Sequence, residues 1–175
     1  MIDYTLGLLT FFSFALIVLY GIAFMLERKN KNHPLVRILG EYGFLLNLLI
    51  ALAATIGSLV YSEIVGFEPC KFCWLQRIFM YPQVFLLGIA LYRKDWNIAI
   101  YCITLSSVGA LIGLNQYLLQ LTGTSFIPCG ATGALACDKI FVEVFGFITI
   151  PLMSLSGFVL MIVSMLFVKK YKKIV

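Results

Sequence analysis

The chain has 175 residues, of which 62% are apolar and only 12% are charged. Soluble domains are usually about 45–50% apolar and about one-quarter charged, so this composition excludes a soluble globular protein and favours a protein embedded in a lipid bilayer. The formal net charge is +5. No segment combines clustered Lys and Arg with polar flanks that would follow a phosphate backbone, so nucleic acid is not an expected partner.

Five apolar runs are long enough to cross a bilayer, which requires about 20 residues of helix. In chain order, we expect membrane spans at residues 4–26, 42–62, 72–92, 96–121 and 147–168. The first run is interpreted as a retained helix and not a secretory signal, because Asp3 precedes it and no basic segment does. The sequence therefore predicts an all-α fold, a polytopic transmembrane helical bundle that forms a single transmembrane domain over residues 1–175.

The basic residues indicate how the bundle is oriented. They cluster at residues 28–37, 93–94 and 169–173, and five spans place all three clusters on one side. The positive-inside rule makes that side the cytoplasm, so we expect the N-terminus outside and the C-terminus inside. On the outer side, the segment 139–145 is too short and too charged to span, and it is expected to be either a short horizontal interfacial segment or an irregular connection.

Most of the cysteines fall on the predicted outer side. Cys102 lies within the fourth span, where it is interpreted as a packing residue, and the single His33 is on the cytoplasmic side. An oxidising compartment favours disulfide chemistry over metal binding, so no metal site is expected. The four outer cysteines are Cys70, Cys73, Cys129 and Cys137.

The first cysteine pair is expected to open a helix, because Pro69 ends the preceding segment and an apolar run follows. A thiol at a helix N-terminus lies near unpaired N–H groups, and Lys71 adds a nearby cation, so the thiolate form should be favoured. Cys70, Cys73 and Arg77 have the spacing i, i+3, i+7 and should share one helix face. Arg77 is interpreted either as a snorkelling anchor or as a cation that polarises an oxygen of a cofactor held against Cys73, for which a membrane quinone fits.

A longer motif around this pair carries a family resemblance. It reads Cys70-x-x-Cys73-Trp74-x-Gln76-Arg77-x-x-Met80-Tyr81-Pro82. The motif resembles that of the membrane thiol oxidases of the DsbB/BdbC type, the disulfide bond formation protein B family. Residues 146–151 are similar to the opening of that family's last helix, and the resemblance covers residues 40–167. Because the family has a four-helix core, the resemblance implies an additional N-terminal transmembrane helix and cytoplasmic loop at 1–39, a DsbB-like core at 40–168 and a basic cytoplasmic tail at 169–175.

The resemblance also implies an enzyme, a thiol:quinone oxidoreductase that drives disulfide bond formation. Cys129 would be attacked by a reduced DsbA-like thioredoxin-fold thiol oxidase, and Cys137 would complete the distal pair. Cys70 would exchange with that pair, and Cys73 would face the quinone, either ubiquinone or menaquinone, which Arg77 helps to bind. The partners would be this oxidase and the membrane quinone pool, in a bacterial cytoplasmic (inner) membrane with the redox loops on the extracytoplasmic side.

Two other functions remain open at this point. A vitamin-K-epoxide-reductase-like oxidase also combines a helix-start Cys-x-x-Cys with loop cysteines, but its loop pair precedes that motif, whereas here it follows. A structural membrane protein could carry two disulfides that only staple its loops. Structural disulfides typically have potentials below about −300 mV, whereas catalytic disulfides are more oxidising, so a redox titration separates these classes.

Overall fold

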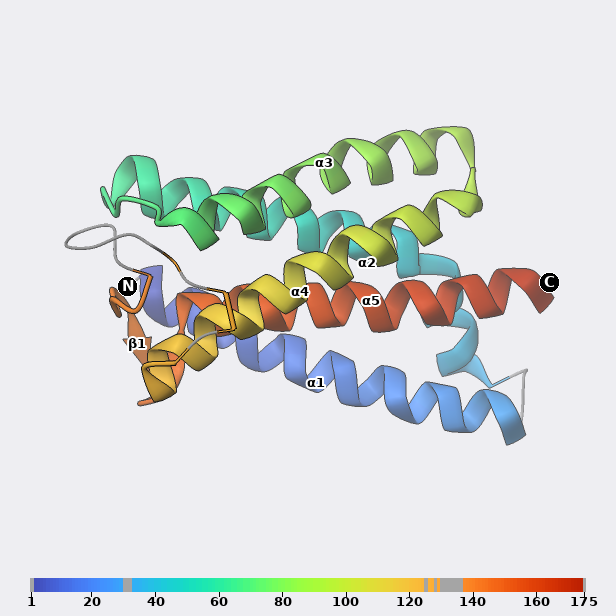
Figure 1. Cartoon of the computed structure of the whole chain (residues 1–175). Helices are drawn as coiled ribbons and strands as arrows, with labels where there is room; N and C mark the ends of the chain where they lie inside the picture. Colours follow the sequence, from blue (N-terminus) through green and yellow to red (C-terminus); the bar gives the residue numbers. More distant parts are fainter. Residues whose placement is uncertain (1, 30–32, 125, 128, 130–136, 175) are drawn as a thin grey trace.

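The computed structural model describes residues 2–29, 33–124, 126–127, 129 and 137–174 (Figure 1). Five of its helices are long and apolar enough to cross a membrane, which confirms the predicted helical bundle. The helices are α1 (Ile2–Lys29), α2 (Pro34–Leu59), α3 (Lys71–Arg93), α4 (Ala99–Thr122) and α5 (Ile150–Ile174). Two short helices, η1 (Val60–Ile64) and η2 (Trp96–Ile98), extend α2 and precede α4.

Helix α2 begins eight residues before the start predicted for the second span. Pro34 occupies the first turn, and His33 is the N-cap, with its Nδ1 accepting a hydrogen bond from the Leu35 N–H at 3.3 Å. Arg37 and Glu41, which had bounded the predicted span, form an i,i+4 ion pair of 3.5 Å on the helix. Capping and this pairing therefore let the helix continue through its charged first turns.

Residues 139–142 form an irregular connection, one of the two expected alternatives, and a short β-hairpin follows it before the last helix. Its strands are β1 (Glu143–Val144) and β2 (Ile148–Thr149), paired antiparallel with Glu143 opposite Thr149. Phe145 and Gly146 both have positive φ, of 55° and 78°, as in the centre of a type I′ turn. The hairpin delays the start of the last span, so α5 begins at Ile150 and not at residue 147.

Helix α5 lies at the centre of the bundle, in contact with α1, α2 and α4, while α3 packs against α2 and α4 (Figure 1). Helices α4 and α5 approach closely where Gly109 faces the ring of Phe158, because a Cβ at Gly109 would overlap that ring. Phe158 is fully buried in the largest hydrophobic cluster, together with Met161 and Met165 of α5. Small residues thus allow the close helix packing that holds a membrane bundle together.

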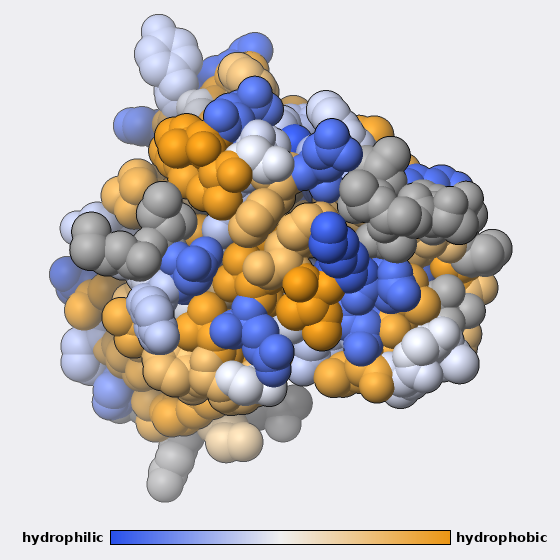
Figure 2. Space-filling view, turned by 90° about the vertical axis from the view of Figure 1, so that its left-hand side faces the viewer, coloured by the Kyte–Doolittle hydropathy of each residue, from blue (hydrophilic) through white to orange (hydrophobic). Residues whose placement is uncertain are grey.

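The two ends of the bundle differ in what they carry. The chain termini lie at opposite ends, as five spans require, and the α1–α2 connection, the α3–α4 connection and the C-terminus share one end (Figure 1). That end carries the predicted basic clusters. The other end carries the start of α3 and the hairpin, and Figure 2 shows hydrophilic side chains scattered among apolar ones there. We call these the basic end and the cysteine end.

Candidate functional site

The Cys-x-x-Cys pair opens helix α3 at the cysteine end. Cys70 is the N-cap residue, in an extended conformation with φ −69° and ψ 173°, and its carbonyl accepts from the Trp74 N–H at 3.0 Å. Cys70 is buried and Cys73 is half-buried. Both are free thiols, and their sulfur atoms lie 3.1 Å apart. We call them the proximal pair, and their geometry suits reversible disulfide formation.

The second pair, Cys129 and Cys137, forms a disulfide with a Cα–Cα distance of 6.1 Å. We call it the distal pair; the residues between its members, 130–136, are outside the described part of the chain. Side chains of helix α4 hydrogen-bond to the backbone on both sides of the distal pair. Asn115 Oδ1 accepts from the Ile127 N–H at 3.1 Å, and Gln120 Nε2 donates to the Lys139 carbonyl at 3.1 Å.

Both pairs belong to one hydrophobic cluster. Cys70 and Cys137 are buried in it beside Ile112, and Cys73 and Cys129 pack against it. The structure therefore brings together all four cysteines that the sequence singled out, although more than 50 residues separate the pairs. Cys102 lies in a different cluster, among residues of α2, α3 and α5, in keeping with a packing role.

A chain of amide side chains leads to the proximal sulfurs, although the sequence alone did not show that it reaches them. Gln116 of α4 donates from Nε2 to Cys70 Sγ at 3.3 Å and to Cys73 Sγ at 3.6 Å. Gln76 Nε2 donates to Gln116 Oε1 at 2.7 Å, and Ser154 of α5 donates to Gln76 Oε1. Polar residues within spans were the available signal, but only the packing of three helices shows that they meet at sulfur.

The electrostatics of Cys70 differ from the expectation for a helix N-terminus. The pKa of the Cys70 thiol lies above its ordinary value, first because of the hydrogen bond to Cys73 and then because of burial. The nearby Lys71 side chain is exposed, so its charge is screened by water. At Cys70, the hydrogen bond to Cys73 and burial therefore oppose the effect that is expected from the helix start.

Arg77 is buried one turn further along α3. Its Nε donates to Ser58 Oγ at 2.9 Å and its Nη2 to the Ser58 carbonyl at 3.1 Å, while its guanidinium carbon lies 5.2 Å from the Trp74 ring centroid. Within the described residues, no acidic side chain forms an ion pair with Arg77. A guanidinium has five N–H donors and two are used here, so Arg77 can also donate to a ligand.

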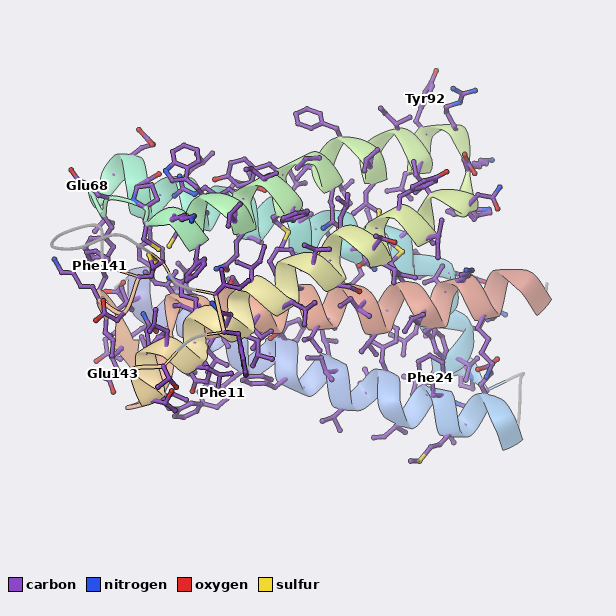
Figure 3. The ribbon with its side chains drawn as sticks, viewed as in Figure 1. Phe11, Phe24, Glu68, Tyr92, Phe141 and Glu143 are labelled. Atoms are coloured by element: carbon purple, nitrogen blue, oxygen red, sulfur yellow. A yellow bond between two sulfur atoms is a disulfide. The ribbon has the colours of Figure 1, made fainter. Side chains whose placement is uncertain are left out.

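Cys73 and Arg77 line the same cavity, which has a volume of about 430 Å³. Ser58, Gln76, Tyr81 and Gln116 are among the polar residues near them, and most of the lining contributed by α1, α2 and α5 is apolar. A mostly apolar cavity with a few convergent polar groups is typical of a binding site for a small organic molecule. In Figure 3, Glu68 and Phe141, two further lining residues, lie at the cysteine end of the bundle.

These features define a class: a membrane-embedded thiol–disulfide protein with two cysteine pairs and an apolar cavity beside one of them. Comparison with known proteins then gives the family. A family model described as "Disulfide bond formation protein DsbB" matches residues 41–168. Because this match covers well over half of the sequence, the chain belongs to the DsbB family, which confirms the predicted resemblance.

Named relatives support the same assignment. The chain is 43% identical over 132 residues to "Probable disulfide formation protein C" of Bacillus cereus, a match that covers 75% of this chain and 95% of the relative. It is 42% identical over 126 residues to "Disulfide bond formation protein C" of Bacillus subtilis, covering 71% and 90% of the two chains. No solved structure matches the chain. The chain is therefore a disulfide-formation membrane protein by family, and the names of its relatives indicate a thiol oxidoreductase.

Proposed function

We propose that this protein is a thiol:quinone oxidoreductase. It would reoxidise a DsbA-like thioredoxin-fold thiol oxidase and pass the electrons through the distal and proximal pairs to a membrane quinone, either ubiquinone or menaquinone. One observation carries the proposal: the proximal pair shares a hydrophobic cluster with the distal disulfide, and its Cys73 also borders the cavity that Arg77 lines. The proximal pair thus has a disulfide on one side and room for an oxidant on the other.

The exchange steps follow from the thiol chemistry. A thiolate of the reduced partner attacks Cys129, Cys137 leaves as a thiolate, and the second partner thiol resolves the mixed disulfide. The reduced distal pair next exchanges with a Cys70–Cys73 disulfide, which restores the distal disulfide and leaves two proximal thiols. A distal disulfide with a proximal dithiol, the combination seen here, is the state that follows this internal exchange.

The cavity residues fit a quinone. A bound quinone supplies the oxidant, because it accepts the two electrons and two protons of the proximal dithiol. Arg77, held by Ser58, would donate a hydrogen bond to a head-group oxygen and stabilise negative charge that develops there. Cys73, which borders the cavity, would be the sulfur next to the head group, and Gln116 would orient both sulfurs.

The membrane orientation is part of the proposal. Positively charged connections favour the cytoplasm, so the basic end would be cytoplasmic and the cysteine end would face outward. In a bacterial cytoplasmic membrane this places both cysteine pairs in an oxidising compartment, where disulfides persist. A partner oxidase outside the membrane could then reach the distal pair.

The test is an anaerobic assay with the purified protein in lipid nanodiscs, a reduced thioredoxin-fold thiol oxidase and a short-chain quinone. Quinone absorbance should fall by one quinone per partner disulfide formed. Cys73→Ala should abolish quinone reduction, whereas Cys102→Ala, which removes a buried thiol outside the site, should preserve it. Absence of quinone reduction by the wild type, with both disulfides below about −300 mV, would instead indicate a structural protein with stapled loops.

A further inference from the structure

Helix α1 lies outside the part of the chain that matches the family. The family match begins at Glu41, within α2. The match to the Bacillus cereus relative covers 95% of that protein, so its unmatched residues are too few for another span. Yet α1 lines the same cavity as Cys73 and Arg77. Its contribution consists of Leu6, Leu9, Thr10, Phe12, Ser13 and Leu16.

The half of α1 towards the basic end is fixed against α5. The ring of Phe167 packs edge-to-face against Tyr20 at 5.5 Å and against Phe24 at 5.1 Å. Lys170 forms an ion pair of 2.7 Å with Glu27, which is only 4% exposed. Lys170 is 42% exposed, but its loss would leave the buried Glu27 carboxylate uncompensated, so this contact favours a docked α1.

The outer end of α1 is fixed as well. The Tyr61 hydroxyl donates to Asp3 at 3.1 Å, and Phe11 packs edge-to-face against Phe145 of the hairpin at 5.3 Å. At Gly7, an added Cβ would lie 2.9 Å from the Val144 side chain, so the helix and the hairpin touch there. Figure 3 shows Phe11 towards the cysteine end of this helix and Phe24 towards the basic end.

Small residues on α1 create the space between its two fixed ends. Thr10 and Ser13 are buried, and their hydroxyls donate to carbonyls of α1 itself, at 3.0 Å to Leu6 and 2.7 Å to Thr10. They therefore use their donors within the helix and present small, nearly apolar surfaces to the cavity. Gly157 of α5 lies on the same cavity wall and adds no side-chain volume.

The direction of this space is set by the antiparallel pairing of α1 and α2. Leu6 contacts Gly57, which precedes the Ser58 that holds Arg77. From Leu6 to Leu16, α1 advances about 15 Å, at 1.5 Å per residue, away from the polar part of the cavity and towards the membrane interior. The cavity thus has a polar end at Arg77 and an elongated apolar part along α1.

We propose that α1 is the side wall of a binding site for the polyprenyl tail of the quinone, with Thr10, Ser13 and Leu16 facing the tail. This inference rests on the proposed function, which places the head group at Cys73 and Arg77. The apolar lining, the elongated shape and the continuity with the polar end all match one ligand that has a polar head and a long apolar chain. In the proteins that lack α1, this side of the cavity would be open to lipid.

A pair of matched variants tests the wall. Ser13→Leu fills the apolar part, whereas Gly21→Leu adds the same side chain to α1 at an exposed position with no atom within 4 Å of its Cβ. Equilibrium dissociation constants are measured in nanodiscs for a long-tailed quinone and for a tail-less analogue with the same head group. In a nanodisc the excluded part of the tail enters lipid and not water, so the loss is that of packing contacts, and long-tail binding should weaken several-fold.

We expect Ser13→Leu to weaken binding of the long-tailed quinone only, and Gly21→Leu to change neither ligand. Equal weakening of both ligands, or no change for either, overturns the tail assignment while quinone binding itself persists. If the wild type binds neither quinone, the proposed function fails as well. Quinone binding by the wild type therefore distinguishes failure of the tail assignment from failure of the proposed function. Mass spectrometry of the purified protein shows whether a phospholipid stays bound. If the long-tailed quinone cannot displace that phospholipid, the cavity holds an acyl chain, and the inference is overturned.

The unaltered protein gives an independent readout. A quinone with a photoreactive diazirine on its tail is bound and irradiated, and the labelled peptides are identified. Label on residues 6–16 supports the assignment of α1 to the tail-binding site. Label confined to α2, α4 or α5 contradicts it, and this result does not depend on whether a variant folds.

Discussion

Replacing Gln116 with Leu should make the proximal pair a weaker oxidant. In the structure, Gln116 donates to both proximal sulfurs, at 3.3 Å to Cys70 and 3.6 Å to Cys73. When the pair is reduced and one of its sulfurs is a thiolate, that sulfur accepts such a bond far better than a disulfide does. The bond therefore stabilises the reduced form, and its loss should shift the reduction potential to a more negative value.

The size of the shift follows from the strength of the bond. A hydrogen bond to a charged group contributes about 1.5–3 kcal/mol. For a two-electron couple, 30 mV corresponds to about 1.4 kcal/mol, so the expected shift is about 30–65 mV. Leu also leaves Gln76 Nε2 without its acceptor, since that atom donates to Gln116 Oε1. Stability should therefore fall by about 1–3 kcal/mol as well, the cost of an unpaired buried donor.

The assay is a redox-buffer titration followed by thiol alkylation and mass spectrometry. Cys129 and Cys137 are replaced with Ala in all samples, so that only the proximal pair titrates. The matched control is Asn115→Leu. Asn115 precedes Gln116 on α4 and is equally buried, but it bonds to the backbone at residues 126–127 and not to sulfur.

The control should have the potential of the parent protein. A Gln116→Leu potential within about 10 mV of the parent, or one shifted to a more positive value, would refute the role given to this side chain. An equal shift in Asn115→Leu would show that any disturbance of α4 has the same effect. In either case, the amide chain would serve packing and not redox tuning.

Three further predictions test the relay and its orientation. Arg77→Lys and Arg77→Met should raise the quinone KM, more for Met and by at most roughly 10–150-fold. Single-turnover disulfide exchange with the partner should stay near wild type. An unchanged KM with slower exchange would instead assign Arg77 to the thiols. Cys137→Ala should accumulate a mixed disulfide between the partner and Cys129 on non-reducing gels, and Cys129→Ala should not; an adduct through Cys137 would reverse the two roles. A membrane-impermeant thiol reagent should label Gly123→Cys but not Lys94→Cys in intact cells, and labelling at residue 94 would invert the proposed topology.

The sequence was sufficient for the spans and for the first cysteine pair, because both depend on local properties. Hydrophobic length alone decides whether a segment can cross a bilayer, and all five predicted spans are helices in the structure. Charges marked the span ends less well, since the His33 cap and the Arg37–Glu41 pair extend α2 through charged residues. The hairpin was missed because its strands are only two residues long, too short for alternation to appear.

Tertiary structure alone decided what surrounds the cysteines. Gln116 reaches the proximal sulfurs only because α3 and α4 cross at that level, and Ser58 holds Arg77 only because α2 ends beside α3. Such contacts join residues far apart in the chain, and no periodicity or spacing encodes which helix faces which. For the same reason, the sequence predicted an additional helix but not that this helix lines the cavity. That depends on the Glu27–Lys170 pair and on the contacts with the hairpin, which hold α1 against the bundle at its two ends.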